Sequence, residues 1–215
     1  MDKVARYFNR AFDFEERDEE AEELNAGPFK TLHSPGEIAN VIEGRIGGFY
    51  KCGEKAVINT AAYQFIDDGR FSSLRLNVPP IPNGFLTAIE NYFRQDLSKE
   101  AIVNVTYNRL LKRFFLRYPT EEETKREKNY IIYNFKNWLS KEESIVLQIH
   151  SHNTMPAFFS STDDKDEYLP GLYGVMGNLD TYHPSMTFRF SGMGLEKLLT
   201  VGEIFADKEV TSYAV

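Results

Sequence analysis

The chain has 215 residues, with 25 lysines and arginines against 32 aspartates and glutamates, which gives a net charge of -7 at pH 7. This acidic balance argues against a general nucleic-acid binder, because neutralising phosphates requires clustered positive charge. The single cysteine, Cys52, excludes an internal disulfide and fits a reducing compartment. No apolar run approaches the length of a membrane span, and no signal-peptide pattern is present. We therefore expect a soluble, cytoplasmic protein with no nucleic-acid or membrane partner.

The N-terminal part divides into two segments by composition. Residues 1–28 are interpreted as an acidic helix or tail, because most long acidic runs are solvated. Residues 29–80 predict a small β-rich unit, with two short strands around a turn at Gly53-Glu54 and a further strand from Ser72 to Val78. Cys52 has no assignable catalytic partner in the sequence, so it is interpreted as a small strand residue.

Residues 81–215 predict a mixed α/β domain, a mixed sheet flanked by helices. The prolines of Pro79-Pro80-Ile81-Pro82 mark its boundary, because they resist both helix and central strand. Asn83 is then expected to cap a helix that runs to about Leu97. Further elements are expected from runs of β-formers and from apolar spacing: strands at 101–107, 114–118, 130–135, 145–149, 172–176 and 186–190, and a final helix within 192–205.

The strongest functional pattern follows the predicted strand at 145–149. His150 and His152 stand one residue apart at its end, where the two-residue period of a strand points both imidazoles to the same face. Asp163 follows eleven residues after His152, with Ser160 three residues before it. His150, His152 and Asp163 could therefore supply three ligands to one metal and leave a fourth position for water, which is the pattern of catalytic zinc.

This run resembles the signature of the JAMM (JAB/MPN) metalloproteases, and in particular their prokaryotic JAB-like members. The signature is His-x-His, then ten residues and an aspartate, with Ser-x-x-Asp at its end; His150, His152, Ser160 and Asp163 all stand at this spacing. Asn153 departs from the pattern, because many members have proline there. The departure bears on the geometry of the loop, since that position binds no metal. The resemblance covers about residues 82–199 and implies the JAMM fold.

The resemblance also implies site residues and a reaction. Family members carry a glutamate near the start of the strand that follows the first helix, and Glu100 occupies the matching place; Glu43 is a weaker candidate, being ahead of the proline boundary. Zinc lowers the pKa of a bound water to about 7. Glu100 would accept the proton of that water and pass it to the departing amine, while Ser160 would donate a hydrogen bond to the developing oxyanion.

The implied substrate is a peptide or isopeptide bond at the C-terminus of a ubiquitin-like protein, and ubiquitin-activating-like or conjugating-like proteins are possible partners. Two alternatives stay open: a zinc amidohydrolase that acts on another small conjugate, and an MPN-like scaffold without catalysis. Other charged and histidine residues are interpreted as solvated or on the surface: Asp164, Asp166, Glu167, His33 and His183.

Overall fold

The structure is a computed structural model that describes residues 30–32, 48–52, 55–120, 124–126, 131–133, 139–140, 142–167, 170–192 and 194–206. Its first sheet, called here the N-terminal sheet, is antiparallel throughout, with strand order β1-β2-β3-β4-β5. The strands are β1 (Lys30–Leu32), β2 (Gly48–Cys52), β3 (Lys55–Asn59), β4 (Tyr63–Asp67) and β5 (Ser72–Leu76). The two predicted short strands and the strand from Ser72 are therefore confirmed, while the predicted turn at Gly53-Glu54 lies outside the described residues.

A second, larger sheet has six strands in the order β13-β12-β11-β10-β6-β7, and only β10 and β11 pair in parallel. These strands are β6 (Ile102–Asn108), β7 (Arg113–Arg117), β10 (Glu143–Ser151), β11 (Gly171–Gly177), β12 (Ser185–Gly192) and β13 (Leu195–Leu199). The short strands β8 (Thr124–Arg126) and β9 (Ile131–Tyr133) form a separate pair. The predicted mixed α/β architecture is confirmed.

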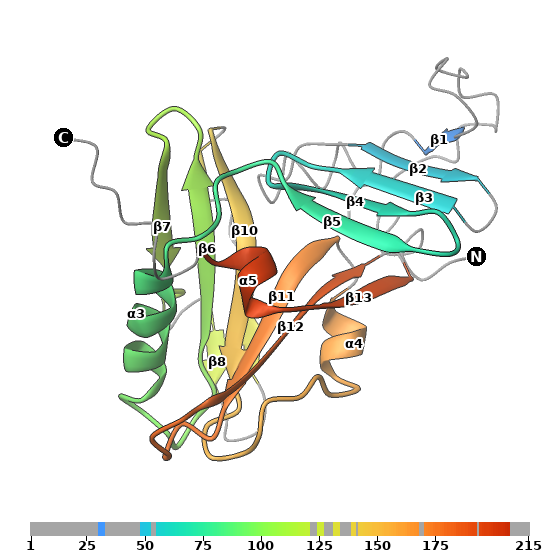
Figure 1. The fold of residues 1–215 in the computed structure, drawn as a ribbon. Coiled ribbons are helices and arrows are strands. Elements are labelled where there is room, and N and C mark those ends of the chain that lie inside the picture. The colour runs from blue at the N-terminus through green and yellow to red at the C-terminus, as the bar shows by residue number, and fades with distance from the viewer. Residues whose placement is uncertain are drawn as a thin grey trace.

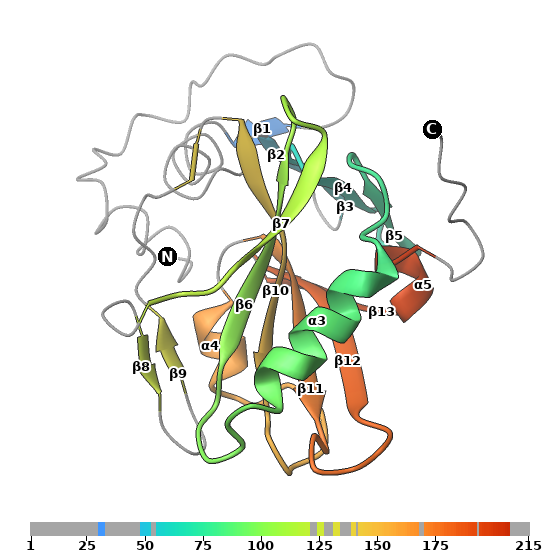
Figure 2. The same ribbon diagram turned by 90° about the vertical axis from the view of Figure 1, so that its left-hand side faces the viewer.

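The helices are α3 (Asn83–Phe93), α4 (Asp163–Asp166) and α5 (Val201–Ile204). Figure 1 shows α3 and α5 near the front of the larger sheet, and the 90° turn in Figure 2 shows α4 on its opposite side. Within the described part of the chain, no helix is both long and apolar enough to cross a membrane.

The strand β10 lies at the centre of the larger sheet and is buried over most of its length. Its run of Ile145, Val146, Leu147 and Ile149 suits a strand covered on both faces, because such strands carry apolar side chains without strict alternation. His150 pairs with Val175 of β11 on one side and with Ile102 of β6 on the other. The histidine motif is thus held between two neighbouring strands, and its backbone position is rigidly defined.

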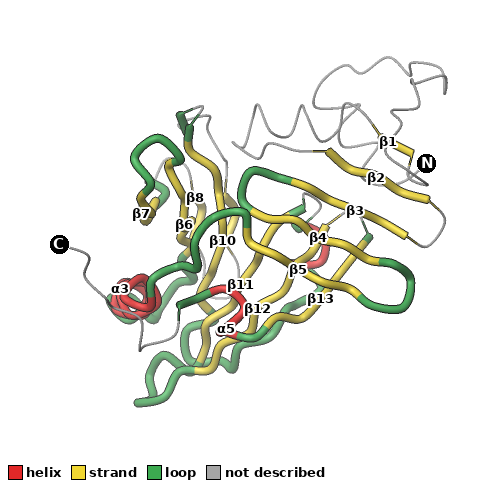
Figure 3. The backbone as a smooth tube through the Cα atoms, turned by 45° about the horizontal axis from the view of Figure 1, so that its top comes forward, coloured by secondary structure: helices red, strands yellow, loops and turns green. Residues whose placement is uncertain are grey.

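The two sheets share one hydrophobic core. Phe65 of β4 stacks on Phe190 of β12 with ring centroids 4.0 Å apart, and Tyr63 meets the same ring edge-on at 5.8 Å. Figure 3 shows the N-terminal sheet beside strands β10 to β13, away from α3.

The proposed division into residues 1–28, 29–80 and 81–215 stays a prediction, and residues 1–28 lie outside the described part of the chain.

Two sequence predictions are wrong in detail. The segment 192–205 is not one helix but the edge strand β13, paired with β12, followed by the single turn α5. Its side chains alternate in exposure along β13, which is the two-residue period of a strand. Asn83 is not the cap of α3: Pro82 occupies the N-cap position and accepts a hydrogen bond from the Phe85 amide, and the helix ends at Phe93.

Candidate metal centre

The imidazoles of His150 and His152 lie together at the end of β10. His150 is the next-to-last residue of the strand, and the His152 amide continues the pairing by donating to the carbonyl of Met176, 2.8 Å away. The ring centroids are 5.1 Å apart. Phe158 packs edge-on against His152, with 4.6 Å between ring centroids. The expected placement of both histidines on one face is therefore what the structure has.

A tightly held loop returns the chain from His152 toward the site. Asn153 adopts a positive φ of 51°, a conformation that proline cannot reach, so this loop differs from one that has proline at that position. The loop lies directly against Gly177, where an added Cβ would come within 2.1 Å of the Met155 carbonyl oxygen. Leu179 donates its amide to the Asn153 carbonyl at 2.7 Å. Backbone contacts thus anchor the loop to the end of β11.

The third candidate ligand, Asp163, is the first residue of α4. Its carboxylate accepts a hydrogen bond from the Ser160 amide at 2.5 Å through Oδ2, which leaves Oδ1 facing His150. The distance from His150 Nε2 to Asp163 Oδ1 is 3.4 Å. One ligand atom from each of His150, His152 and Asp163 lies within 4.8 Å of the others. The loop thus brings Asp163 close to two histidines that lie eleven and thirteen residues before it in the sequence.

This donor set fits a zinc ion. Tetrahedral zinc with bonds of about 2.0–2.1 Å separates its ligand atoms by roughly 3.4 Å, and the His150–Asp163 pair already has that spacing. Two imidazoles and one carboxylate are a combination that catalytic zinc uses. The Nδ1 atom of His152 is buried and has no hydrogen-bond partner among the described residues. His150, His152 and Asp163 could therefore bind a metal, with one coordination position left for a non-protein ligand.

The electrostatics of the histidines favour the form that binds metals. Burial lowers the pKa of His150 to about 4, against the opposing charge of Asp163, and burial lowers the pKa of His152 as well. Both imidazoles are consequently neutral at pH 7, and metal coordination requires a neutral ring nitrogen. The positive charge of Arg189 contributes to the low pKa of His150, which places that guanidinium in the neighbourhood of the site.

Glu100 precedes a segment that is tied to the end of β10, and it lies near enough to Asp163 to be affected by its charge. Ser151 donates its amide to the Ala101 carbonyl at 2.8 Å, and its hydroxyl accepts from the Ala101 amide at 2.9 Å. Glu100 is 3% exposed, and burial together with the charge of Asp163 raises its pKa to about 7. A carboxylate with a pKa near the working pH is suited to accept and return a proton. A bound divalent cation would lower this pKa again.

Ser160 lies at the start of the turn that carries Asp163. Its hydroxyl oxygen accepts hydrogen bonds from the amides of Thr162 and Asp163, at 3.2 and 3.3 Å. Because these contacts use the oxygen as an acceptor, the hydroxyl proton remains available for donation. The structure thus brings Ser160 together with Asp163, and its hydroxyl is half-buried at the edge of the cluster.

The sequence analysis predicted that the acidic residues after Asp163 are solvated, and for Glu167 this prediction is wrong. Glu167 is 7% exposed and forms an ion pair with Arg189 of β12, with 2.7 Å between Oε2 and Nε. Asp164 is more exposed and pairs with the same guanidinium at 2.9 Å. No local pattern could reveal these contacts, because Arg189 lies more than twenty residues further along the chain.

The remaining candidates from the sequence are Cys52, His183, Glu43 and His33. Cys52 is in β2 of the N-terminal sheet, and His183 is exposed, as predicted for a surface histidine. Glu43 and His33 fall outside the described residues.

The fold and the donor set define an α/β domain with a candidate metal centre at the end of its central strand. Residues 86–191 match the family model of the prokaryotic homologs of the JAB domain. The chain therefore carries a JAB/MPN-like domain, and the matched stretch contains Glu100, both histidines, Ser160 and Asp163.

Other comparisons add little. No curated protein sequence matches the chain. Among solved structures, the solution structure of protein DSY2949 from Desulfitobacterium hafniense is similar at 12% sequence identity and a TM-score of 0.37, covering 55% of this chain and 88% of that chain. A likeness this weak carries no weight for fold or function.

Proposed function

We propose that this protein is a zinc-dependent metallopeptidase that hydrolyses a peptide or isopeptide bond at the C-terminus of a ubiquitin-like protein. The observation that carries the proposal is the convergence of the ligand atoms of His150, His152 and Asp163 to within 4.8 Å, together with the buried Glu100, on which the charge of Asp163 acts. The JAB/MPN-like domain supports it, because that family includes metalloproteases. An assembled ligand set is harder to reconcile with a scaffold, since a scaffold has no need of one.

Each residue of the site has a role that its surroundings permit. His150, His152 and Asp163 would hold the zinc, which when bound supplies a Lewis acid that activates water and polarises a carbonyl. Glu100, with its raised pKa, takes a proton from the attacking water and delivers it to the amine that leaves. The hydroxyl of Ser160 donates to the oxygen of the scissile carbonyl as negative charge builds there.

The proposed substrate class is supported by the family and by the shape of a ubiquitin-like C-terminus. Such a tail is extended, so it can pair with a strand edge and present its last peptide bond in a fixed register. The partner would be the ubiquitin-like protein or its conjugates, together with ubiquitin-activating-like or conjugating-like proteins that make them.

The test uses the full chain loaded with zinc and a panel of ubiquitin-like proteins that carry a fluorogenic amide at the C-terminus. We expect release of the fluorophore that stops when a chelator removes the metal, returns on addition of zinc, and is absent in Glu100→Ala. Stoichiometric zinc with no hydrolysis of any panel member would contradict the proposed substrate class. Cleavage of small amide conjugates instead would assign the site to an amidohydrolase.

A further inference from the structure

Arg189 is a buried cation next to the candidate metal centre. It lies on β12, opposite Tyr173 of β11 and Leu198 of β13, and its side chain is 4% exposed. Burying a guanidinium is costly unless anions and hydrogen bonds compensate it. The contacts of Arg189 therefore show which segment of the chain its charge stabilises.

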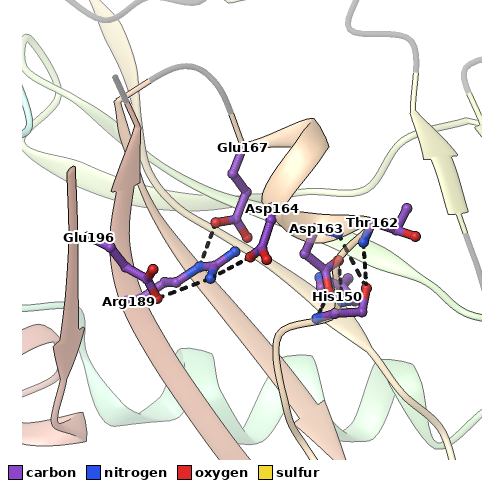
Figure 4. A network of polar contacts seen from close by, with 8 residues as sticks. His150, Thr162, Asp163, Asp164, Glu167, Arg189 and Glu196 are labelled. Atoms are coloured by element: carbon purple, nitrogen blue, oxygen red, sulfur yellow. Dashed lines mark hydrogen bonds and ion pairs between the residues drawn. The ribbon is translucent and has the colours of Figure 1, made fainter. Parts of the chain in front are cut away.

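Those contacts surround the turn that carries Asp163. The Nε atom lies 2.7 Å from Glu167 Oε2, and Nη1 lies 2.9 Å from Asp164 Oδ1. The guanidinium carbon is 3.9 Å from the centroid of the Phe159 ring, a cation–π contact. Figure 4 shows Arg189 between Glu196 of β13 on one side and the carboxylates of Asp164 and Glu167 on the other. The contacted residues 159, 164 and 167 lie on both sides of Asp163 in the sequence.

The helix α4 is too short to be stable on its own hydrogen bonds. It has four residues, and so short a helix is not stable by itself. Its carboxylates also repel one another, because Asp163, Asp164 and Glu167 lie within five residues of chain. The hydrogen bonds around Ser160 hold its start, and the bond from the Glu167 amide to the Asp163 carbonyl closes the turn without joining it to the sheet. Attachment of its far end to the sheet must come from tertiary contacts, and the Glu167–Arg189 pair supplies one.

We propose that Arg189 is a positioning residue that fastens α4 to the sheet and thereby holds Asp163 at ligand distance from His150. The site is then formed before any metal arrives. This inference rests on the proposed function only in naming zinc as the ion that Asp163 binds. Residues that orient metal ligands in this way typically change the affinity for the metal by about 10–100-fold when replaced.

The opposite end of β10 offers a matched control for the loss of a buried arginine–glutamate pair. Arg117 pairs with the buried carboxylate of Glu143 through two nitrogens, with both contacts at 2.7 Å, far from the ligands. Arg189→Met and Arg117→Met each remove a guanidinium from a buried glutamate. If either chain fails to fold, the double variants Arg189→Met/Glu167→Gln and Arg117→Met/Glu143→Gln remove both charges of the pair.

Two readouts test the role. The first is hydrogen exchange in the metal-free protein at the amides of Asp163, Asp164 and Glu167, which bond within the turn. We expect at least a tenfold loss of protection at these amides in the Arg189 variants and none in the Arg117 variants. The second is zinc affinity, measured by competition with a chromophoric chelator. We expect about 10–100-fold weaker binding in the Arg189 variants and wild-type affinity in the Arg117 variants.

The outcomes separate this inference from the proposed function. Unchanged protection of the α4 amides in a folded Arg189 variant would overturn the positioning role. Equal loss of zinc affinity in both arginine variants would also overturn it, because the effect would then be one of general stability. If wild type binds no zinc, the proposed function fails, and the exchange measurement on metal-free protein still decides the role of Arg189.

Discussion

Glu143 and Glu100 are buried carboxylates at opposite ends of β10, and their electrostatic surroundings differ in sign. At the first end, burial acts to raise the pKa of Glu143, but hydrogen bonds from Arg117 and Thr106 outweigh it and the pKa lies below its usual value. At the other end, burial and the negative charge of Asp163 raise the pKa of Glu100 to about 7. The start of β10 thus has a carboxylate whose charge is balanced by Arg117. At its end, two carboxyl groups, Glu100 and Asp163, lie near neutral imidazoles.

The difference distinguishes a structural from a functional use of the same side chain. The Glu143–Arg117 pair has its cation within the protein, so it needs nothing further to be stable. The cluster at the other end combines donor atoms that prefer a cation with a glutamate poised to exchange a proton. The comparison predicts that changes at the two ends will affect different properties of the protein.

The largest effect is expected from Glu100→Ala. Removing a general acid and base typically lowers the rate by about 10²–10⁴-fold, and Glu100 is not among the ligands. We expect zinc content to stay at the wild-type level while hydrolysis is lost. The measurement is kcat/KM on the fluorogenic substrate alongside metal analysis of the same sample; normal turnover in this variant would remove Glu100 from the mechanism.

Ser160→Ala should have the next largest effect. Loss of one donor to a developing oxyanion lowers kcat by about 10²–10³-fold in other hydrolases. The same substitution also removes the acceptor of the Thr162 and Asp163 amides, so zinc affinity must be measured in parallel. A fall in kcat at saturating zinc supports the assigned role. A defect that saturating zinc corrects would show that Ser160 acts only through the turn.

At the other end of β10, Arg117→Met is expected to lower stability without touching the metal. Removing one partner of a fully buried pair costs about 3–5 kcal/mol, but Arg117 is 38% exposed, so we expect about 2 kcal/mol. Denaturant unfolding measures this free energy. Zinc affinity should equal that of wild type, and a matching loss of affinity would break the distinction between the two ends.

The pH dependence of zinc binding gives the smallest effect. Glu100 holds a proton below pH 7 in the metal-free protein, and a bound cation favours its charged form, so affinity should fall by at most about tenfold per pH unit as pH falls from 7 to 5.5. His150, whose pKa is lowered to about 4, should add nothing in this range, and the lowered pKa of His152 makes its contribution smaller than that of an ordinary histidine. Chelator competition should find that zinc affinity depends less on pH in Glu100→Gln than in wild type; an equal slope in the two proteins would show that Glu100 does not carry the pH dependence.

Much of the site could be predicted from the sequence because its features are local. The two-residue period of a strand places His150 and His152 on one face, and the spacing to Ser160 and Asp163 spans a single loop. The strands around the motif carry runs of β-formers that identify them without tertiary information. The resemblance to the JAMM signature therefore rested on a segment of fourteen residues.

The remainder depended on contacts between distant segments. Arg189 is buried by contacts with Phe159, Asp164 and Glu167, all of which lie more than twenty residues before it in the chain. The burial of Glu100 accompanies the pairing of its neighbour Ala101 with Ser151, fifty residues further along the chain. The error at residues 192–205 has a similar origin, because an apolar edge strand and an amphipathic helix are hard to separate without knowing the partner strand.

The central claim is tested most directly by elemental mass spectrometry on purified wild type and on His152→Ala in parallel, with both shown to be folded. The account predicts close to one zinc per chain in wild type and its loss in the variant, since His152 is one of the three ligands. Wild-type protein that takes up no zinc even after addition of the metal would contradict the account and favour a scaffold without catalysis.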